Sequence, residues 1–276
     1  MKNDIKNFIF ARTTTNFFTL KPMNEFSTNH LVFFSPTHTS AKIARAIGEG
    51  IGMGRRIETD LTLDESDSPI EINDSLTVIA APVYGGRVAP VALQRIKRLK
   101  GNNSPAIVVV VYGNRDYEDA LLEMNDILTK CGFTVIASGA FVAQHSMAPE
   151  IGAGRPDGED EKEIHKFAET VKNSTAVENV QVPGNRPYKP EMNMPVAPIS
   201  LPSCTKCGKC VTVCPTNAIS VADGAVITDI EKCILCMACT HICTEQARIR
   251  PLPLQQKTEQ MLGALKGVRN KNEVFL

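Results

Sequence analysis

The sequence predicts an α/β protein, in which a doubly wound parallel sheet is followed by a smaller, cysteine-rich domain. Three observations lead to this prediction. Residues 30–175 alternate apolar runs typical of strands with stretches of helical spacing. Residues 183–202 carry six of the seventeen prolines, which favours an extended, semi-rigid linker over a helix or a central strand. Eight of the nine cysteines lie between Cys204 and Cys243.

The first predicted elements are a strand, a helix and an edge strand. Residues 31–35 (LVFFS) are almost wholly apolar, as in a strand that is buried on both faces. A helix is expected over residues 38–50, because apolar side chains recur there at helical spacing and Gly50 ends the run. Residues 56–59 fit a strand at the edge of the sheet.

Three further strands alternate with three further helices. The strongest strand prediction is the run AIVVVVY, because β-branched residues suit a sheet that is covered on both faces. Asp157 suits the N-cap of the last helix. The predicted strands are residues 76–81, 106–112 and 133–142, and the predicted helices are residues 90–99, 116–130 and 157–173.

Five parallel strands joined by crossover helices form a doubly wound sheet. Ligands of such sheets bind beyond the carboxyl ends of the strands, at the point where the strand order reverses. The loops that follow Ser35, Ala81 and Tyr112 are therefore the places where we expect a ligand.

Composition argues against several classes of protein. The chain of 276 residues has 30 Lys+Arg and 30 Asp+Glu, so it lacks the basic excess typical of nucleic-acid binding. It holds no run of 18 or more apolar residues, so a membrane span is not expected. The apolar patch near the N-terminus, four residues long, is too short for a secretory signal. Since a dense cysteine cluster is typical of metal binding in a reducing compartment, we expect a cytoplasmic protein.

The cysteines form two runs of the same pattern, C-x-x-C-x-x-C-x-x-x-C. This is the spacing of bacterial ferredoxins with two 4Fe–4S clusters. Three thiolates within seven residues can bind one face of a cubane. The fourth is expected to open a short helix that carries its sulfur to the other cluster. The predicted ligands are Cys204, Cys207, Cys210 and Cys243 for one cluster, and Cys233, Cys236, Cys239 and Cys214 for the other.

A pair of structural zinc sites is the alternative, although zinc usually takes its ligands from two separated pairs. Pro215 follows the first run, whereas Thr244 stands where a second proline often follows. The ninth cysteine, Cys131, is expected to be a buried core thiol near the end of a helix.

The segment SPTHTS, residues 35–40, joins the first strand to the first helix. Hydroxyl and backbone N–H groups at a helix N-terminus bind anions without a positive side chain, which suits the terminal phosphate of FMN. The segment is neither a Walker A loop nor a dinucleotide fingerprint. Taken alone, its Ser and Thr residues could equally be helix caps.

Residues 82–87 (PVYGGR) and 112–117 (YGNRDY) carry three of the four tyrosines. Aromatic side chains beside glycine at strand ends suit a flat ring held close to the backbone. Alternatively, these tyrosines only cover the end of the sheet. Because all three loops meet at one switch point, we favour a flavin.

These motifs resemble a known family. The segments FFSPTHTSAKIA, PVYGGRVAP, VVYGNRDYEDAL, FVAQHS and GRP, with the two cysteine runs, are similar to the flavodoxin–ferredoxin fusion proteins, which are soluble electron carriers. The resemblance implies a flavodoxin-like sheet of order 2-1-3-4-5 and a small α+β domain of the bacterial ferredoxin type. The implied domains are a leader of unknown role at 1–29, an FMN-binding domain at 30–178, a linker at 179–202, a two-cluster domain at 203–252 and a helix and tail at 253–276.

The resemblance also implies the cofactors, FMN and two 4Fe–4S clusters. His38 stands where the family usually has glycine or another small residue, and His145 is either a flavin neighbour or a structural residue. Arg87 and Arg115 either approach the flavin or face solvent. The expected FMN-binding residues are Ser35, Thr37, His38, Thr39, Ser40, Pro82, Val83, Tyr84, Gly85, Gly86, Tyr112, Gly113, Asn114, Arg115 and Tyr117.

We therefore expect a soluble protein that relays electrons between two clusters and FMN, and on to redox partner proteins. One alternative is an FMN-dependent reductase of a small molecule, such as a quinone, a nitro compound or a nicotinamide. Another is a regulatory or scaffold protein with zinc in the cysteine runs. Neither a nucleic-acid partner nor a membrane span is expected, and the sequence leaves a homodimer open.

Overall fold

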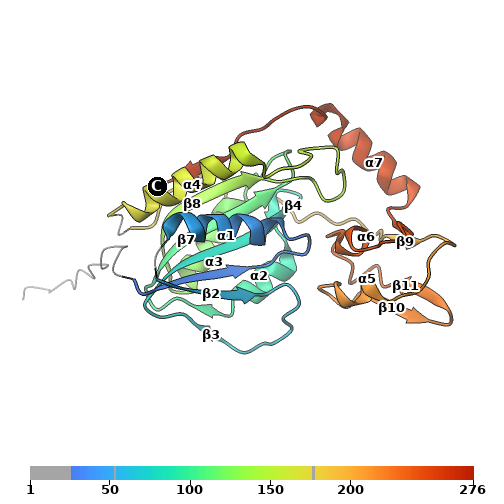
Figure 1. The fold of residues 1–276 in the computed structure, drawn as a ribbon, viewed down its shortest axis with the longest axis horizontal. Helices are drawn as coiled ribbons and strands as arrows, with labels where there is room; N and C mark the ends of the chain where they lie inside the picture. The colour runs from blue at the N-terminus through green and yellow to red at the C-terminus, as the bar shows by residue number, and fades with distance from the viewer. Residues whose placement is uncertain (1–25, 53, 176–177) are drawn as a thin grey trace, which may run out of the picture.

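A computed structural model describes residues 26–52, 54–175 and 178–276, so most of the leader lies outside it. Figure 1 shows an α/β domain beside a smaller domain, with helix α7 above the smaller domain. The strands of the α/β domain are β1 (Thr28–Phe33), β2 (Arg55–Asp60), β3 (Ile70–Glu71), β4 (Ser75–Tyr84), β5 (Arg87–Val88), β6 (Leu99–Lys100), β7 (Pro105–Tyr112) and β8 (Thr134–Val142). Its helices are α1 (Thr39–Ile51), α2 (Pro90–Ile96), α3 (Ala120–Lys130) and α4 (Gly158–Lys172).

The main sheet has the order β13-β8-β7-β4-β1-β2, and β5 pairs with β4. Strands β2, β1, β4, β7 and β8 are parallel neighbours. Numbered among themselves along the chain, they follow the order 2-1-3-4-5, which is the flavodoxin-like order. This confirms the predicted fold class. The order reverses between β1 and β4, so the switch point lies beside the loop that follows β1.

Some element boundaries differ from the sequence-based expectation. Strand β4 continues to Tyr84, where it pairs with the short strand β5. Helix α3 begins at Ala120 rather than at residue 116, because a carboxylate oxygen of Asp116 accepts a hydrogen bond from the backbone N–H of Glu118 and closes a turn. The predicted N-cap Asp157 is confirmed, and it forms a capping box with Asp160.

The core of the α/β domain lies on both faces of the sheet. Successive residues from β1 into the following Phe34 alternate between two groups of buried side chains. Leu31 and Phe33 pack with α1 and α4 on one face, whereas Val32 and Phe34 pack with α2 and α3 on the other. A buried phenylalanine contributes roughly 1.5–3 kcal/mol to folding, so this two-sided burial accounts for the stability of the domain.

The smaller domain has little regular structure. Two antiparallel pairs, β9 (Ile199–Ser200) with β12 (Arg248–Ile249) and β10 (Ile219–Ala222) with β11 (Ala225–Thr228), enclose two helices of four residues. These helices, α5 (Lys209–Thr212) and α6 (Ala238–His241), contain the third cysteine of each run. The expectation that the fourth cysteine opens a helix is therefore wrong, because Cys214 and Cys243 follow these helices.

The chain then returns to the α/β domain. Helix α7 (Leu252–Leu262) leads through the 3-10 turn η2 (Gly263–Leu265) to strand β13 (Glu273–Phe275), which pairs antiparallel with β8. The sheet thus gains an antiparallel edge strand beside the five predicted parallel strands. The smaller domain is attached to the α/β domain at both of its ends, by the linker and by the C-terminal segment.

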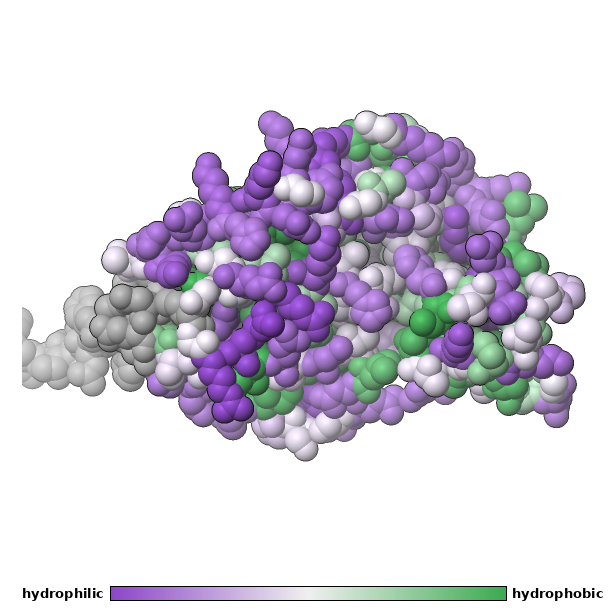
Figure 2. Space-filling view, viewed as in Figure 1, coloured by the Kyte–Doolittle hydropathy of each residue, from purple (hydrophilic) through white to green (hydrophobic). Residues whose placement is uncertain are grey.

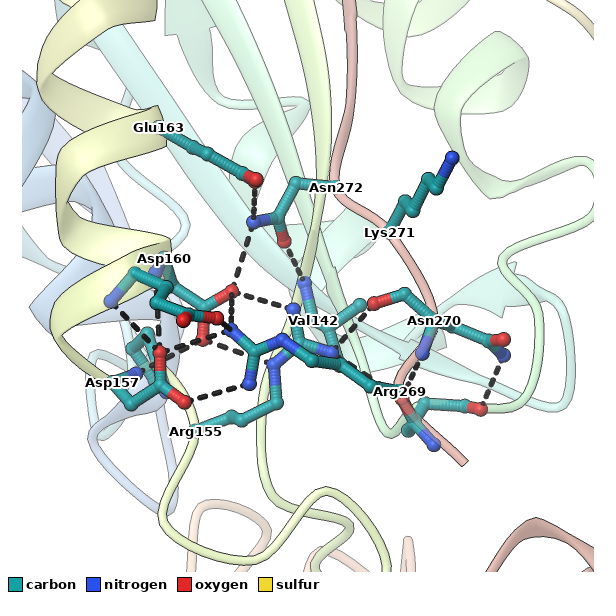
Figure 3. Close-up of polar contacts among 12 residues, drawn as sticks. Val142, Arg155, Asp157, Asp160, Glu163, Arg269, Asn270, Lys271 and Asn272 are labelled. Carbon is teal, nitrogen blue, oxygen red and sulfur yellow. Dashed lines mark hydrogen bonds and ion pairs between the residues drawn. The ribbon is translucent and has the colours of Figure 1, made fainter. Parts of the chain in front are cut away.

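Polar contacts hold the C-terminal segment in place (Figure 3). Arg155 donates to Asp160 and to the carbonyl oxygen of Asn270, and both members of this ion pair are buried. The Asn272 side chain accepts from the Val142 N–H at 2.8 Å and donates to Asp160 at 2.9 Å. The segment is therefore an integral part of the α/β domain. Within the described part of the chain, none of the helices combines the length and apolarity that crossing a bilayer requires.

Candidate functional site

A cavity opens at the carboxyl ends of the parallel strands, where the sequence predicted a ligand. All three predicted loops contribute to it. The predicted residues that line it are Thr37, Thr39, Pro82, Val83, Tyr84, Gly85, Tyr112, Gly113 and Arg115. The segment after β8 completes the wall with Ala143, Gln144, His145, Ser146 and Met147.

The roof of this cavity comes from parts of the chain that lie far away in the sequence. Met192 of the linker, Ile234 and Leu235 of the smaller domain, and Met261 and Leu262 of α7 line it. Ile234 also packs against the core of the α/β domain. Sequence reasoning missed these residues. The available signal was the apolar pair between Cys233 and Cys236, which is poorly suited to a loop facing water.

The loop after β1 has the features of an anion site. Ser40 Oγ is buried without a hydrogen-bond partner. It lies in the first turn of α1, where backbone N–H groups have no intrahelical acceptor and the helix dipole favours negative charge. Ser35 Oγ instead accepts from the Ala41 N–H at 3.0 Å, so this hydroxyl serves as a helix cap. His38 is exposed and adopts a φ of 66°, which explains why glycine suits the position.

Tyr84 lies between the cavity and the cysteines of the smaller domain. It lines the cavity, and it also lines a second hollow together with Cys233. Burial raises the pKa of the Tyr84 hydroxyl well above its usual value, and the nearby thiols of Cys236 and Cys233 add to this effect. The phenol therefore stays protonated and can donate a hydrogen bond.

Two glycines allow close approaches beside Tyr84. Gly85 has a φ of 63°, and a Cβ there would lie 2.6 Å from the Cβ of Met192. Gly86 has a φ of 85°, and a Cβ there would collide with the carboxylate of Glu118. Gly86 therefore shapes the loop without lining the cavity.

The loop after β7 is held by the C-terminal segment. The Tyr112 hydroxyl donates to the carbonyl oxygen of Lys271 at 2.9 Å, and the Tyr117 hydroxyl donates to Glu273 at 2.7 Å. The Asn114 side chain donates to the carbonyl oxygen of Val268 at 2.8 Å. Asn114 and Tyr117 are not among the residues that line the cavity. Their polar groups position the loop instead.

His145 forms part of the cavity wall and is neutral. Burial lowers its pKa to about 4, and the positive charges of Arg250 and Arg115 act in the same direction. Its Nδ1 accepts from the Met147 N–H at 3.2 Å, which leaves the proton on Nε2. A Cβ at Gly113 would lie 2.5 Å from the imidazole, so glycine is needed for this packing.

The two arginines that the sequence left undecided are both paired. Arg87 binds Glu123 and lies over the ring of Tyr188, with 13% of its side chain exposed. It does not line the main cavity. Arg115 lines it and pairs with Glu118 at 2.9 Å.

Two further cavities lie inside the smaller domain, and each is lined by four cysteines. One, the outer cysteine cavity, is lined by Cys204, Cys207, Cys210 and Cys243. The other, the inner cysteine cavity, is lined by Cys214, Cys233, Cys236 and Cys239. Each cavity takes three thiols from one run and the fourth from the other, so the structure brings together the members of both predicted sets.

The separate thiols suit a cubane. Among the described residues, no three His, Cys, Asp or Glu side chains converge on the position of a single metal ion. A cubane does not require this, because each of its four irons takes a different thiolate.

The two cavities differ in their exposure to water. Cys236 is buried, which raises its pKa to about 12, whereas Cys207 is exposed. Burial also raises the pKa values of Cys210 and Cys239, and the Arg248 guanidinium opposes this at both thiols. Cys131 is the C-cap of α3 and packs against the core, as expected, but it is only partly buried.

A buried arginine connects the anion site to the smaller domain. Arg95 of α2 donates to the carbonyl oxygens of Leu61, at 3.1 Å, and Pro215, at 2.7 Å. The neighbouring Thr62 Oγ1 accepts from the Ser35 N–H at 2.8 Å. Since Pro215 follows Cys214 directly, the inner cysteine cavity is fixed relative to the loop after β1.

Known proteins resemble the smaller domain. Residues 203–248 match the family of 4Fe–4S dicluster domains. The polyferredoxin-like subunit of an aliphatic sulfonate oxidoreductase from Pyrococcus furiosus is 49% identical over 45 residues, which are 15% of this chain and 26% of that one. An uncharacterized ferredoxin-like protein from Haemophilus influenzae is 34% identical over 65 residues, which are 21% of this chain and 76% of that one. The chain thus spans about a quarter of the first relative and about three quarters of the second.

Solved structures similar to this chain include rubredoxin:oxygen oxidoreductase from Desulfovibrio gigas. It is 18% identical, with a TM-score of 0.39 over 56% of this chain and 37% of that one. A flavodoxin from the domain Archaea is 12% identical, with a TM-score of 0.35 over 54% of this chain and 98% of that one. The order of its parallel strands identifies the α/β domain as flavodoxin-like, independently of these similarities.

Proposed function

Because the chain belongs to the ferredoxin-like proteins through its C-terminal domain, an electron-transfer domain with two 4Fe–4S clusters, we propose that it relays electrons between these clusters and a bound FMN, and on to redox partner proteins. One observation carries this proposal. The cavity at the switch point of a flavodoxin-like sheet is roofed by Ile234 and Leu235, which lie between two predicted cluster ligands.

The residues of the α/β domain fit FMN. The first turn of α1 and the unpartnered hydroxyl of Ser40 suit its phosphate. Tyr84 and the neutral His145 form walls that suit a flat ring. When bound, FMN can take up two electrons and release them singly, whereas each cluster carries one.

The arrangement of the cysteines supports an order for the two clusters. Cys214, Cys233, Cys236 and Cys239 would hold the cluster next to the flavin, because Ile234 and Leu235 line both the inner cysteine cavity and the flavin cavity. Cys204, Cys207, Cys210 and Cys243 would hold the outer cluster. Since Cys207 is exposed, redox partners would exchange electrons on this side of the domain.

The contribution of the smaller domain to the cavity wall favours the carrier over a small-molecule reductase, because Leu235 brings the cysteine-rich domain directly against the cavity. Turnover of a defined small molecule without a partner protein would favour this alternative over the carrier. We also propose a cytoplasmic location, which the reducing conditions needed by exposed cluster ligands support.

The experiment is anaerobic purification followed by quantification of flavin, iron and sulfide, and then a reductive titration. We expect about one FMN and about eight iron atoms per chain, as two four-iron clusters require. Cys207→Ala should lose one cluster and keep the flavin. Stoichiometric zinc with little iron would contradict the proposal, and so would loss of the flavin from Cys207→Ala with both clusters intact.

A further inference from the structure

Arg248 is a buried cation without a carboxylate partner. It is 4% exposed, and its backbone is fixed by the pairing of β12 with β9, where it lies opposite Ser200. Its guanidinium donates to Ser200 Oγ at 3.0 Å and to Thr228 Oγ1, and its Nε has no hydrogen-bond partner. Within the described residues it forms no ion pair. The carboxylate of Glu245, which lines the outer cysteine cavity together with Arg248, is exposed and contacts Thr244 rather than Arg248.

This guanidinium lies between the two cysteine cavities. Arg248 itself lines the outer cavity, and its partner Thr228 lines the inner one. Its positive charge opposes the rise in pKa that burial causes at Cys210 in the outer set and at Cys233 and Cys239 in the inner set. One positive charge therefore acts on both sets of cysteines.

A buried charge without a partner is costly, so the fold must compensate it. Hydroxyl groups alone do not provide a counter-charge. A cluster bound by four thiolates carries net negative charge, and reduction adds one more. Net charge and hydrogen bonds to sulfur are the main determinants of cluster potentials. The natural counter-ions of Arg248 are thus the two clusters.

We propose that Arg248 is a positioning residue that compensates the charge of both clusters at once and raises the reduction potential of each. This inference rests on the proposed function, because it requires clusters in the two cysteine cavities. Charge compensation would stabilise the reduced form of each cluster more than the oxidised form, since the reduced form carries the additional negative charge.

A matched control is available at the same cavity. Lys206 also lines the outer cysteine cavity, but its side chain is exposed. Water screens an exposed charge, whereas a buried charge acts at low dielectric. Lys206→Gln and Arg248→Gln both remove one positive charge, so the difference between them isolates the effect of burial.

The test is a redox titration of the iron-loaded proteins, followed by electron paramagnetic resonance. Arg248→Gln should shift the reduction equilibrium of both clusters at least tenfold toward the oxidised form, which is a decrease of 59 mV for one electron. Arg248→Lys, which keeps the charge, should retain most of the wild-type potential of each cluster. Lys206→Gln should change either equilibrium less than threefold. Unchanged potentials in Arg248→Gln, or a shift confined to one cluster, would overturn the inference.

A second variant covers the case in which Arg248→Gln does not assemble its clusters. Thr228→Asp places a carboxylate where the guanidinium donates, so it neutralises Arg248 without removing it. It should lower the reduction potentials of both clusters by about as much as Arg248→Gln does. Unchanged potentials would again overturn the inference. Absence of iron from the wild-type protein would instead refute the proposed function.

Discussion

The two domains differ in what fills their interiors. In the α/β domain, two groups of apolar side chains cover the two faces of the sheet. In the smaller domain, the buried cluster is small, with Leu235 and Met237 packed against Leu254 of α7, and two cavities lined by cysteines lie beside it. Figure 2 shows apolar patches on the surface of this domain. Its exposed apolar residues are Ile199, Leu201, Val221, Ile227, Ile230 and Ile242.

This difference indicates how each domain is stabilised. Hydrophobic burial can fold the α/β domain without a cofactor. The smaller domain buries too little to fold alone, so the binding of its clusters must supply the stability, as metals do in other small domains. The contacts between the two domains therefore depend on the stability that the clusters give to the smaller domain.

The largest expected effect follows from removing iron and sulfide. Residues 203–250 should lose at least about a hundredfold in protection against amide hydrogen exchange, which equals about 2.7 kcal/mol. Strands β1, β4 and β7 should keep their protection, because their core contains no cysteine of the two runs. Hydrogen exchange followed by mass spectrometry measures both. Equal loss of protection in the two domains would contradict the conclusion that the clusters stabilise only the smaller domain.

A substitution in the core should have the next largest effect. Phe141 is buried and packs against Phe167, with 5.8 Å between the ring centroids. Phe141→Ala should lower the free energy of unfolding of the α/β domain by about 3–5 kcal/mol. The control is Ile227→Ala in the smaller domain, which should cost less than about 0.5 kcal/mol because the side chain is 49% exposed. Denaturant unfolding measures both free energies. Similar losses of stability in the two variants would refute the proposed difference between the two interiors.

Acid should weaken the α/β domain through two partly buried histidines. The pKa of His145 is about 4 in the folded protein, and the pKa of His30 is also lowered by burial. The unfolded chain therefore binds more protons, and stability falls as the pH drops from about 6.5 to about 4. For His145 the loss reaches roughly 3 kcal/mol, from about 1.4 kcal/mol per pH unit. His145→Gln should flatten this part of the curve, and an unchanged curve would exclude His145 as its source.

The smallest effect concerns the anion site. Ser40→Ala removes a buried hydroxyl that has no partner without FMN, so it should raise the stability of the flavin-free protein by up to about 1 kcal/mol. The dissociation constant for FMN should rise about fivefold, since roughly 1 kcal/mol of hydrogen bonding is lost. Fluorescence titration measures this constant. Ser220→Ala, an exposed site in β10, is the control, and equal FMN binding by the two variants would exclude Ser40 from the site.

The sequence predicted those features that depend on local pattern. The β-branched run of β7 and the spacing of the cysteines correctly indicated a doubly wound sheet and a two-cluster domain. Features that depend on contacts between distant segments were missed. The apolar pair Ile234 and Leu235 indicates a loop that avoids water, but nothing in the sequence indicated that it would line this cavity. The strand within the tail escaped prediction because Glu273–Phe275 is too short to show a period, and its pairing with β8 is set by tertiary contacts.

The direct test of the central claim is an anaerobic crystal structure of the loaded protein, with iron located by its anomalous signal. We expect flavin density in the cavity lined by Tyr84, His145 and Leu235, with the cluster bound to Cys233 and Cys236 nearer to it than the cluster bound to Cys207. Flavin density outside this cavity, or a nearer approach by the Cys207 cluster, would contradict the account.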